Sequence, residues 1–430
     1  IHSISSPLRR AVRPTPLSPL PLSPFSPLSP FSPIMADRSL KKMTKKKVTV
    51  GGTKKTESIM GNVNSTKSAR RTKKSTNQPG KGLAKEKATN RDKRSTTKKE
   101  EEKKPDNGRR PIYASRNPDL PSTTQMNDLR QYVKEVIEKG VKGLLDEYET
   151  VKKYNIDPML NKNHLANPTK NRYKDINCID PTRVILEGEG NNYIHANHVK
   201  GEPFINDFIC TQGPMESTME DFWKMIAQEN VGYIVMLCDL MELGKKKCEK
   251  YIPEKVDEEK TYGEIRVKLL DSNSSHPQFI MSNLLMEAPG TNSRVIFHYQ
   301  WREWPDHGVP VTTNAALRAL STVRGSTFTA IVHCSAGVGR TGTLVAVEWV
   351  LQTIMKGEKV DMKKMLKEMR NQRAHAIQTN MQYVYVAQCA LRLWTKVDEE
   401  KLFPNLSNED VFLNFTSDMK AANPAAYDPK

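Results

Sequence analysis

Apolar side chains recur at regular spacing only after about Met126, so the folded part of the chain is expected to begin near that residue. Residues 1–110 carry 28 of the 67 Lys and Arg side chains but only 8 of the 49 Asp and Glu side chains. Residues 36–110 are mainly Lys, Thr, Ser, Asn and Gly, so they cannot bury enough apolar surface to offset chain entropy. We therefore expect residues 35–120 to be a disordered basic tail.

Residues 1–34 form a separate low-complexity segment rich in Pro and Ser. Ser-Pro recurs at every third residue, at Ser23, Ser26, Ser29 and Ser32, a pattern typical of an extended, solvated chain. Such a segment could be phosphorylated or could bind an aromatic groove. Met35 resembles a natural start, so translated leader sequence is an equally good interpretation of residues 1–34.

The basic runs of the tail allow more than one interpretation. Runs such as Lys45–Lys47, Arg70-Arg71 and Lys93-Arg94 could contact acidic partners, nucleic acid or anionic membrane without specificity, or could direct nuclear import. Residues 36–110 contain no aromatic side chain for base stacking, so sequence-specific nucleic-acid recognition is not expected. A solvated cationic tail is the simpler interpretation.

The six cysteines indicate a reducing compartment. They form no CxxC pair and no Cys/His cluster with zinc spacing, so neither a metal nor a disulfide framework is expected. Several lie in apolar runs, where a free thiol behaves as a small hydrophobe. No apolar run approaches the roughly 20 residues that span a bilayer. We expect a cytoplasmic protein, with nuclear location through the tail as an alternative.

After Met126 the spacing of apolar residues changes between helix and strand periods. Steps of three and four residues predict a first helix from Met126 to Leu145. β-prone runs predict strands at 192–199, 206–211, 231–237, 264–270, 294–300 and 329–333, and later helices are predicted at 343–355, 362–370 and 381–394. This order predicts an α/β (α+β type) domain over residues 125–400, a single mixed twisted sheet flanked by helices. Residues 401–430 are expected to be a flexible C-terminal tail.

The run around Cys334 is the strongest indication of chemistry. A β-prone segment ends at His333, a Gly-rich turn comes next, and a helical pattern begins directly after it. This arrangement directs backbone N–H groups and a helix N-terminus at one spot, where they can hold an anion. Arg340 adds a planar fork suited to two phosphate oxygens. The run therefore predicts a phosphate-binding loop made of Ser335, Ala336, Gly337, Val338 and Gly339.

Cys334 lies at the bottom of this predicted loop. The groups that attract phosphate also favour thiolate over thiol, and a thiolate can attack a phosphate monoester to form phosphocysteine. We expect the Thr341 hydroxyl to hydrogen-bond the sulfur and His333 to orient the loop. The alternative interpretation is that Cys334 is a buried core thiol beside an ordinary turn. That interpretation does not explain the two glycines and the arginine that follow the cysteine. The CxxxxxR pattern resembles that of the cysteine-based protein phosphatases.

Two further segments resemble loops of the classical tyrosine phosphatases. Trp304-Pro305-Asp306 resembles the movable loop of that family, which implies that Asp306 is general acid and later base; a surface turn is the alternative. Residues 171–176 resemble the phosphotyrosine-recognition loop. By this resemblance Tyr173 stacks on the substrate ring, Ile176 adds an apolar contact and Asp175 anchors the peptide backbone.

The resemblance to classical non-receptor protein tyrosine phosphatases covers about Leu129 to Leu393 and implies further roles. An acid supports the phosphate-binding arginine, a lysine approaches the general acid, two arginines belong to the final motif of the family, and two glutamines position the hydrolytic water. The residues at these positions are Glu242, Lys247, Arg370, Arg373, Gln378 and Gln382. The resemblance implies no cofactor and no metal, and phosphotyrosine-containing proteins as substrates.

Three positions call for comment. His195 stands where the family usually has Asn, and Ile252 stands where Trp is usual, so local packing is expected to differ. His375 could narrow the mouth of the cleft. Two other functions stay open. One is a phosphotyrosine-binding pseudophosphatase, and the other makes the basic tail the functional part.

Overall fold

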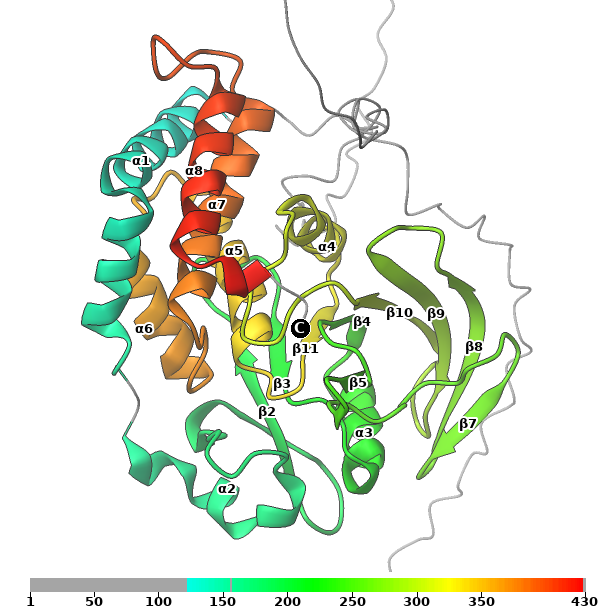
Figure 1. The fold of residues 1–430 in the computed structure, drawn as a ribbon. Coiled ribbons are helices and arrows are strands. Elements are labelled where there is room, and N and C mark those ends of the chain that lie inside the picture. The colour runs from blue at the N-terminus through cyan, green and yellow to red at the C-terminus, as the bar shows by residue number, and fades with distance from the viewer. Residues whose placement is uncertain (1–121, 155–156, 428–430) are drawn as a thin grey trace, which may run out of the picture. The chain divides into compact units, whose positions relative to one another are not determined.

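The computed structural model describes residues 122–154 and 157–427, so the predictions for residues 1–34 and 35–120 lie outside the described residues. Within them the chain folds around one large mixed sheet with helices packed against it, as Figure 1 shows. This confirms the predicted α/β class. A separate hairpin of strands β5 and β6 stands beside the large sheet.

The large sheet has nine strands in the order β1-β2-β3-β11-β4-β10-β9-β8-β7. Its four central strands, β3, β11, β4 and β10, run parallel, and the neighbours at both edges pair antiparallel. The strand bounds are β1 Arg183–Ile185, β2 Tyr193–Val199, β3 Phe208–Thr211, β4 Val231–Met236, β5 Met241–Glu242, β6 Lys245–Lys246, β7 Glu259–Tyr262, β8 Ile265–Asn273, β9 Phe279–Glu287, β10 Arg294–Trp301 and β11 Thr329–His333.

Strands β3, β4 and β11 are almost entirely buried, as expected of strands whose two faces are both covered. Helix α3 packs against β4, and α5 packs against β11 and β3. The α-helices are α1 Thr123–Val151, α2 Lys162–Ala166, α3 Met219–Gln228, α4 Asn314–Arg324, α5 Gly339–Met355, α6 Met362–Gln372, α7 Asn380–Val397 and α8 Asn408–Ala422. Every residue of α5 is buried, so this helix is enclosed by the rest of the domain.

The carboxyl ends of the parallel strands meet at one edge of the sheet. His333 at the end of β11 lies in register with Thr211 of β3 and with Met236 of β4. Met236 in turn lies in register with Gln300 of β10. The loops that leave these strands therefore converge, which is where ligands bind in open sheets of this kind.

The prediction of a flexible C-terminal tail over residues 401–430 is wrong for most of that segment. Helix α8 covers Asn408–Ala422, and a short 3-10 helix, η6, covers Pro424–Tyr427. Ser407 caps α8 through a reciprocal capping box with Asp410, and Val411, Phe412, Phe415 and Met419 are buried. The polar composition of the segment conceals one apolar helix face, which packs on α7 and α1.

Candidate active site

The loop after β11 is held in a tight curl at its glycine. Gly337 has a φ of +70°, and a Cβ atom there would lie 2.0 Å from the Thr211 carbonyl oxygen, so only glycine fits. This curl turns the backbone N–H of Gly337 toward Cys334, whose Sγ atom accepts its hydrogen bond at 3.2 Å. Cys334 is buried, with 3% of its surface exposed. Helix α5 begins at Gly339, so its N-terminus belongs to the same loop.

The predicted hydrogen bond from Thr341 to the sulfur is not formed. The Thr341 Oγ1 atom is buried and has no hydrogen-bond partner among the described residues. Thr341 belongs to the first turn of α5, where the helix fixes the direction of its side chain. The backbone N–H of Gly337 donates to the sulfur instead. The sequence shows a glycine at this position but does not indicate that its N–H contacts the sulfur.

Arg340 is almost fully buried and lies at the centre of the charged groups in the site. Its two terminal nitrogens bind the Glu242 carboxylate at 2.6 and 3.1 Å, and they also reach the Trp304 carbonyl oxygen and Asp306 Oδ1, each at 3.1 Å. Burial alone would lower the pKa of Arg340, but Cys334 and Glu242 raise it, so the guanidinium stays charged. Its Nε–H has no partner among the described residues.

Glu242 is brought to Arg340 by the β5–β6 hairpin. Leu243 and Gly244 both have positive φ, 51° and 70°, as the two central residues of a tight hairpin of this type require. The carboxylate is further fixed by the backbone N–H of Asp239, which donates to Glu242 Oε1 at 3.0 Å. The hairpin therefore holds the carboxylate in the orientation that receives both guanidinium nitrogens.

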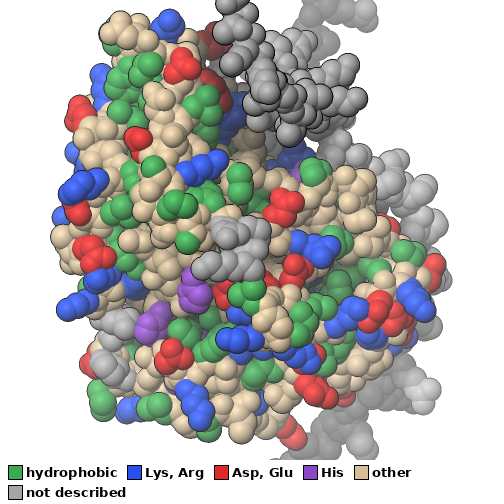
Figure 2. Space-filling model, in the orientation of Figure 1, with side chains coloured by type: hydrophobic (Ala, Val, Ile, Leu, Met, Phe, Trp, Pro, Cys, Tyr) green, Lys and Arg blue, Asp and Glu red, His purple; other side chains and the backbone are tan. Residues whose placement is uncertain are grey.

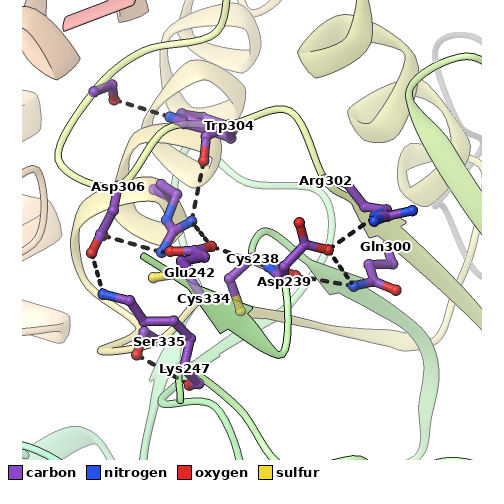
Figure 3. A network of polar contacts seen from close by, with 12 residues as sticks. Cys238, Asp239, Glu242, Lys247, Gln300, Arg302, Trp304, Asp306, Cys334 and Ser335 are labelled. Carbon is purple, nitrogen blue, oxygen red and sulfur yellow. Dashed lines mark hydrogen bonds and ion pairs between the residues drawn. The ribbon is translucent and has the colours of Figure 1, made fainter. Parts of the chain in front are cut away.

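Asp306 lies between two cations. Its Oδ2 atom accepts a hydrogen bond of 2.5 Å from Lys247 Nζ, and its Oδ1 atom accepts the 3.1 Å bond from Arg340. Burial would raise the pKa of this carboxyl group, but Arg340 and Lys247 outweigh burial and lower it. Figure 3 shows Asp306, Glu242, Lys247 and Cys334 gathered in one place although they come from three different parts of the chain.

Trp304 anchors the loop that carries Asp306. Its buried ring packs against Trp301 and Tyr385, with centroids 4.9 and 5.6 Å away, and its Nε1–H donates to the Gly308 carbonyl oxygen at 3.1 Å. The loop is thus folded back on itself around the tryptophan. Asp306 lies in the intervening turn and faces the cations.

Tyr173 lies at the rim of the loop after β11. Ser335 Oγ is 3.1 Å from the Lys247 carbonyl oxygen, which can only accept, so the serine hydroxyl donates there. The Tyr173 hydroxyl, 2.8 Å from Ser335 Oγ, is then the donor in that contact. Ile176 is buried and Asp175 is exposed. The predicted recognition loop is therefore adjacent to the predicted phosphate-binding loop.

The two glutamines lie against the start of α5. A Cβ atom on Gly339 would lie 2.5 Å from Gln378 Oε1 and 3.2 Å from Gln382 Nε2. Gln382 Oε1 also accepts from the backbone N–H of Gln378 at 2.9 Å. Arg370 is farther from the chemistry, since its guanidinium binds backbone carbonyl oxygens of Ala376 and Ile377 and of the segment after α1. It holds the glutamine segment in place.

Arg373 is a site residue whose contacts the sequence does not indicate. Its guanidinium binds the carbonyl oxygens of Gly337 and Ala336 at 3.0 and 3.1 Å, which orients the N–H groups of that loop inward. Its Nη2–H also donates to His195 Nδ1 at 3.1 Å, and His195 Nε2 donates to the Ile176 carbonyl oxygen at 2.8 Å. Burial and the nearby Arg373 lower the pKa of His195 well below its usual range, so the ring is neutral.

The other unusual positions are Ile252 and His375. Tyr251, which directly precedes Ile252, is buried, and its hydroxyl lies 2.7 Å from the Nε2 atoms of both His298 and His333. His375 has a φ of +64°, is half-buried, and its Nε2 atom has no hydrogen-bond partner among the described residues. His333 also contacts the Cys334 carbonyl oxygen through Nδ1 at 3.2 Å.

The positive charge at this site is local. On the face drawn in Figure 2, Lys and Arg side chains are interspersed with Asp and Glu side chains. The described residues contain no group of three or more His, Cys, Asp or Glu side chains placed to hold a metal ion. Arg340, whose Nε–H has no partner among the described residues, and the backbone N–H groups of the loop after β11 are the groups that can bind an anion here, whereas Lys247 is paired with Asp306.

Comparison with known proteins agrees with this geometry. Residues 167–392, more than half of the chain, match the family model of the protein-tyrosine phosphatases. The chain belongs to the protein-tyrosine phosphatase family. It is 33% identical over 288 residues to receptor-type tyrosine-protein phosphatase eta of Gallus gallus, covering 64% of this chain and 20% of that protein.

Two further relatives are similar. The mouse (Mus musculus) receptor-type tyrosine-protein phosphatase eta is 35% identical over 259 residues, 58% of this chain and 21% of that protein. The bovine (Bos taurus) receptor-type tyrosine-protein phosphatase F is 34% identical over 253 residues, 57% of this chain and 13% of that protein. The match thus spans about a fifth of these relatives or less. No helix among the residues described here is long and apolar enough to cross a membrane.

Proposed function

We propose that this chain hydrolyses phosphotyrosine in proteins through a phosphocysteine intermediate on Cys334. The observation that carries the proposal is that Cys334, Arg340 and Asp306 meet at one buried spot, at the carboxyl edge of the parallel strands. Asp306 Oδ1 is 3.1 Å from Arg340, and Figure 3 shows Cys334 in the same cluster as Asp306 and Glu242. The proposed nucleophile, the arginine that would bind phosphate and the proposed acid are thus all close enough to act on one substrate phosphate.

Substrate binding would use the backbone N–H groups of the loop between Cys334 and Arg340 together with the Arg340 Nε–H, which has no partner among the described residues. Tyr173 would wall a slot deep enough for a phenyl ring, with Ile176 as an apolar contact and Asp175 available to the peptide backbone. Phosphoserine is too short to reach the sulfur across such a slot. A slot of this depth would favour phosphotyrosine over phosphoserine as the substrate.

In the first step the Cys334 thiolate attacks phosphorus, an S–P bond forms and the P–O bond to the tyrosine ring breaks. The leaving oxygen takes the proton of Asp306. Arg340 and Lys247 keep Asp306 ionised in the free enzyme. The negative charge of a bound phosphate near Arg340 would offset these cations, so the pKa of Asp306 would rise on substrate binding and the acid would be protonated when it is needed.

In the second step water attacks the phosphocysteine, the S–P bond breaks and inorganic phosphate forms. Asp306, now ionised, accepts the proton of that water. Gln378 and Gln382 would orient the water, because both side chains lie against Gly339 at the start of α5. The loop N–H groups and Arg340 would stabilise the charge that develops on the phosphoryl oxygens in both steps.

An aryl phosphate assay on the full chain tests this proposal with two variants. We expect Cys334→Ser to abolish turnover, because the hydroxyl is not ionised as the thiolate is. We expect Asp306→Ala to slow turnover by about 10²–10⁴-fold while the substrate still binds. Turnover that persists in Cys334→Ser would refute the mechanism. Substrate binding without turnover by the unaltered chain would indicate a pseudophosphatase.

We further propose a cytoplasmic location, which the six free cysteines support because thiols persist in a reducing compartment. The basic tail would contact acidic partners, nucleic acid or anionic membrane through its charge alone. Deleting residues 1–110 from the full chain and comparing its location and nucleic-acid retention in cells tests this role. Unchanged location and retention would contradict it.

A further inference from the structure

The C-terminal end of the described chain contacts the loop that carries Asp306. We name residues Pro424–Tyr427, the 3-10 helix η6, the C-terminal clasp. The Val309 N–H donates to the Ala426 carbonyl oxygen at 2.9 Å. A Cβ atom on Gly308 would lie 2.3 Å from that same oxygen, so the two backbones touch at a glycine. Ala426 is only 7% exposed. In Figure 1 the end of α8 lies beside the loop between β10 and α4.

The clasp is held at the end of an anchored helix. Phe415 and Met419 of α8 are 4% and 0% exposed, and Gln388 Nε2 of α7 donates to Thr416 Oγ1 at 2.9 Å. Arg392 of α7 forms an ion pair of 2.7 Å with Glu409. Side chains along the length of this helix therefore fix its position, and the clasp begins directly after Asn423.

Gly308 is the point at which the clasp and the catalytic machinery meet. Its carbonyl oxygen accepts from Trp304 Nε1 at 3.1 Å and from Gln382 Nε2 at 3.5 Å. Its own N–H donates to the Pro305 carbonyl oxygen at 3.1 Å. The clasp therefore adjoins the loop two residues from Asp306, on a turn whose geometry directs the carboxylate toward Arg340.

We propose that the C-terminal clasp is a positioning element for the general acid. By accepting from Val309 and closing against Gly308, it holds the Asp306 loop in the conformation that brings the carboxylate over Cys334. The inference rests on the proposed phosphatase function. The clasp touches neither substrate nor sulfur, so its effect must pass through Asp306.

The exposed neighbour of Ala426 offers a matched control. Ala426→Glu places a large charged side chain at a buried position and should push the clasp away from the loop, whereas Ala425→Glu makes the same change at an exposed position. In the full chain we expect Ala426→Glu to lower kcat for an aryl phosphate about 10-fold with little change in KM, because a small misplacement of a catalytic group is costly. Ala425→Glu should leave both constants unchanged.

Repeating the substitution in a variant that lacks the general acid separates a positioning effect from a general loss of structure. With Asp306→Asn already present, Ala426→Glu should change kcat by less than about twofold, because residues that act as a unit are not additive. An equal further loss in that background would overturn the inference. Equal kcat for Ala426→Glu and Ala425→Glu would also overturn it. A chain without Cys334-dependent turnover would instead refute the proposed function.

Amide hydrogen exchange provides a readout that needs no activity. We expect the Val309 N–H to exchange faster in Ala426→Glu than in Ala425→Glu, because its acceptor has moved, while amides of β11 keep their protection. Unchanged exchange at Val309 would show that the clasp does not hold the loop, and would contradict the inference even if kcat fell.

Discussion

In the proposed mechanism, Asp306 is ionised in the free protein and protonated when the leaving group departs. Two hydrogen bonds from cations hold it ionised before substrate binds. In that mechanism Arg340 would also bind phosphate, so its hydrogen bond to Asp306 is expected to weaken when substrate binds. Lys247 has no such second role, and its own pKa is raised by Asp306 although burial opposes this. Lys247 therefore sets the acidity of Asp306 independently of substrate.

Removing the Lys247 charge tests that assignment. In Lys247→Met the carboxylate loses a 2.5 Å hydrogen bond and a neighbouring cation, so the pKa of Asp306 rises. The alkaline limb of kcat/KM, which reports the loss of the acid's proton in the free enzyme, should move to higher pH. Lys245→Met removes the same charge from an exposed position of the hairpin and should leave the limb in place. A limb unmoved by Lys247→Met would contradict the assignment.

His298 of β10, Tyr251 and His333 of β11 form a series of hydrogen bonds that ends at the Cys334 backbone. The positions of its protons can be deduced. The Cys334 carbonyl oxygen only accepts, so His333 Nδ1 is protonated and Nε2 is an acceptor. The Tyr251 hydroxyl then donates to His333 Nε2, and it accepts from His298 Nε2. A proton on His333 Nε2 would displace the hydrogen bond from Tyr251, and a proton on His298 Nδ1 would be a buried donor with no acceptor among the described residues. Burial accordingly lowers the pKa of His298 to about 3 and that of His333 to about 4.

These two histidines predict a loss of stability in acid. Both imidazoles have folded-state pKa values below the unfolded value of 6.5, so the unfolded chain binds more protons as the pH falls through 6.5 and unfolding becomes easier. Each histidine should lower the free energy of unfolding by about 2 kcal/mol as the pH falls from 6.5 to 5. The stability that depends on these two neutral imidazoles is fully present above pH 6.5.

Urea unfolding at pH 7 and pH 5 measures this effect. We expect the unaltered chain to lose about 2 kcal/mol more than His298→Gln over that interval, because glutamine cannot take up the proton. The His298→Gln chain is expected to be less stable at pH 7, so the comparison concerns the difference between the two pH values in each chain. Equal losses would show that His298 is not held neutral.

The local sequence predicts helices and strands correctly where apolar residues recur with a clear period. It does not predict elements whose conformation depends on packing against neighbouring elements. All six predicted strands occur, because their apolar runs are buried in the sheet. Strand β9 was not predicted, since Ser282 and Asn283 interrupt its apolar residues and only pairing with β8 and β10 fixes them as strand. Helix α4 was not predicted either, because its apolar face is made mainly of short alanines.

The same distinction applies to the site. Cys334, the loop glycines and Arg340 lie in one run, so their proximity results from local geometry. Arg373 reaches the carbonyl oxygens of that loop, and Tyr251 reaches the His333 side chain beside it, only through tertiary packing. Nothing in their local sequence indicates which atoms they bind. The contact of Gly308 with Ala426 joins residues 118 positions apart in the chain, which no local pattern predicts.

At the scale of the whole molecule, the folded domain extends to at least Tyr427 rather than ending near residue 400. Helices α1, α7 and α8 pack on one another. Arg130 of α1 binds Asp398 at 2.6 and 2.7 Å, and Trp394 Nε1 donates to the same carboxylate at 2.8 Å. The first and last helices of the domain therefore enclose α7. This closure makes α8 part of the core rather than an appendage.

A pair of substitutions on α8 tests whether the helix unfolds with the domain. Phe415 is 4% exposed and Leu413 is 53% exposed. Phe415→Ala should lower the free energy of unfolding of the full chain by about 3–5 kcal/mol, because it leaves a cavity between α8 and its neighbours. Leu413→Ala should change it by no more than about 0.5 kcal/mol. If α8 instead unfolded separately, Phe415→Ala would add an early transition and leave the main one unchanged, and the domain would end at α7.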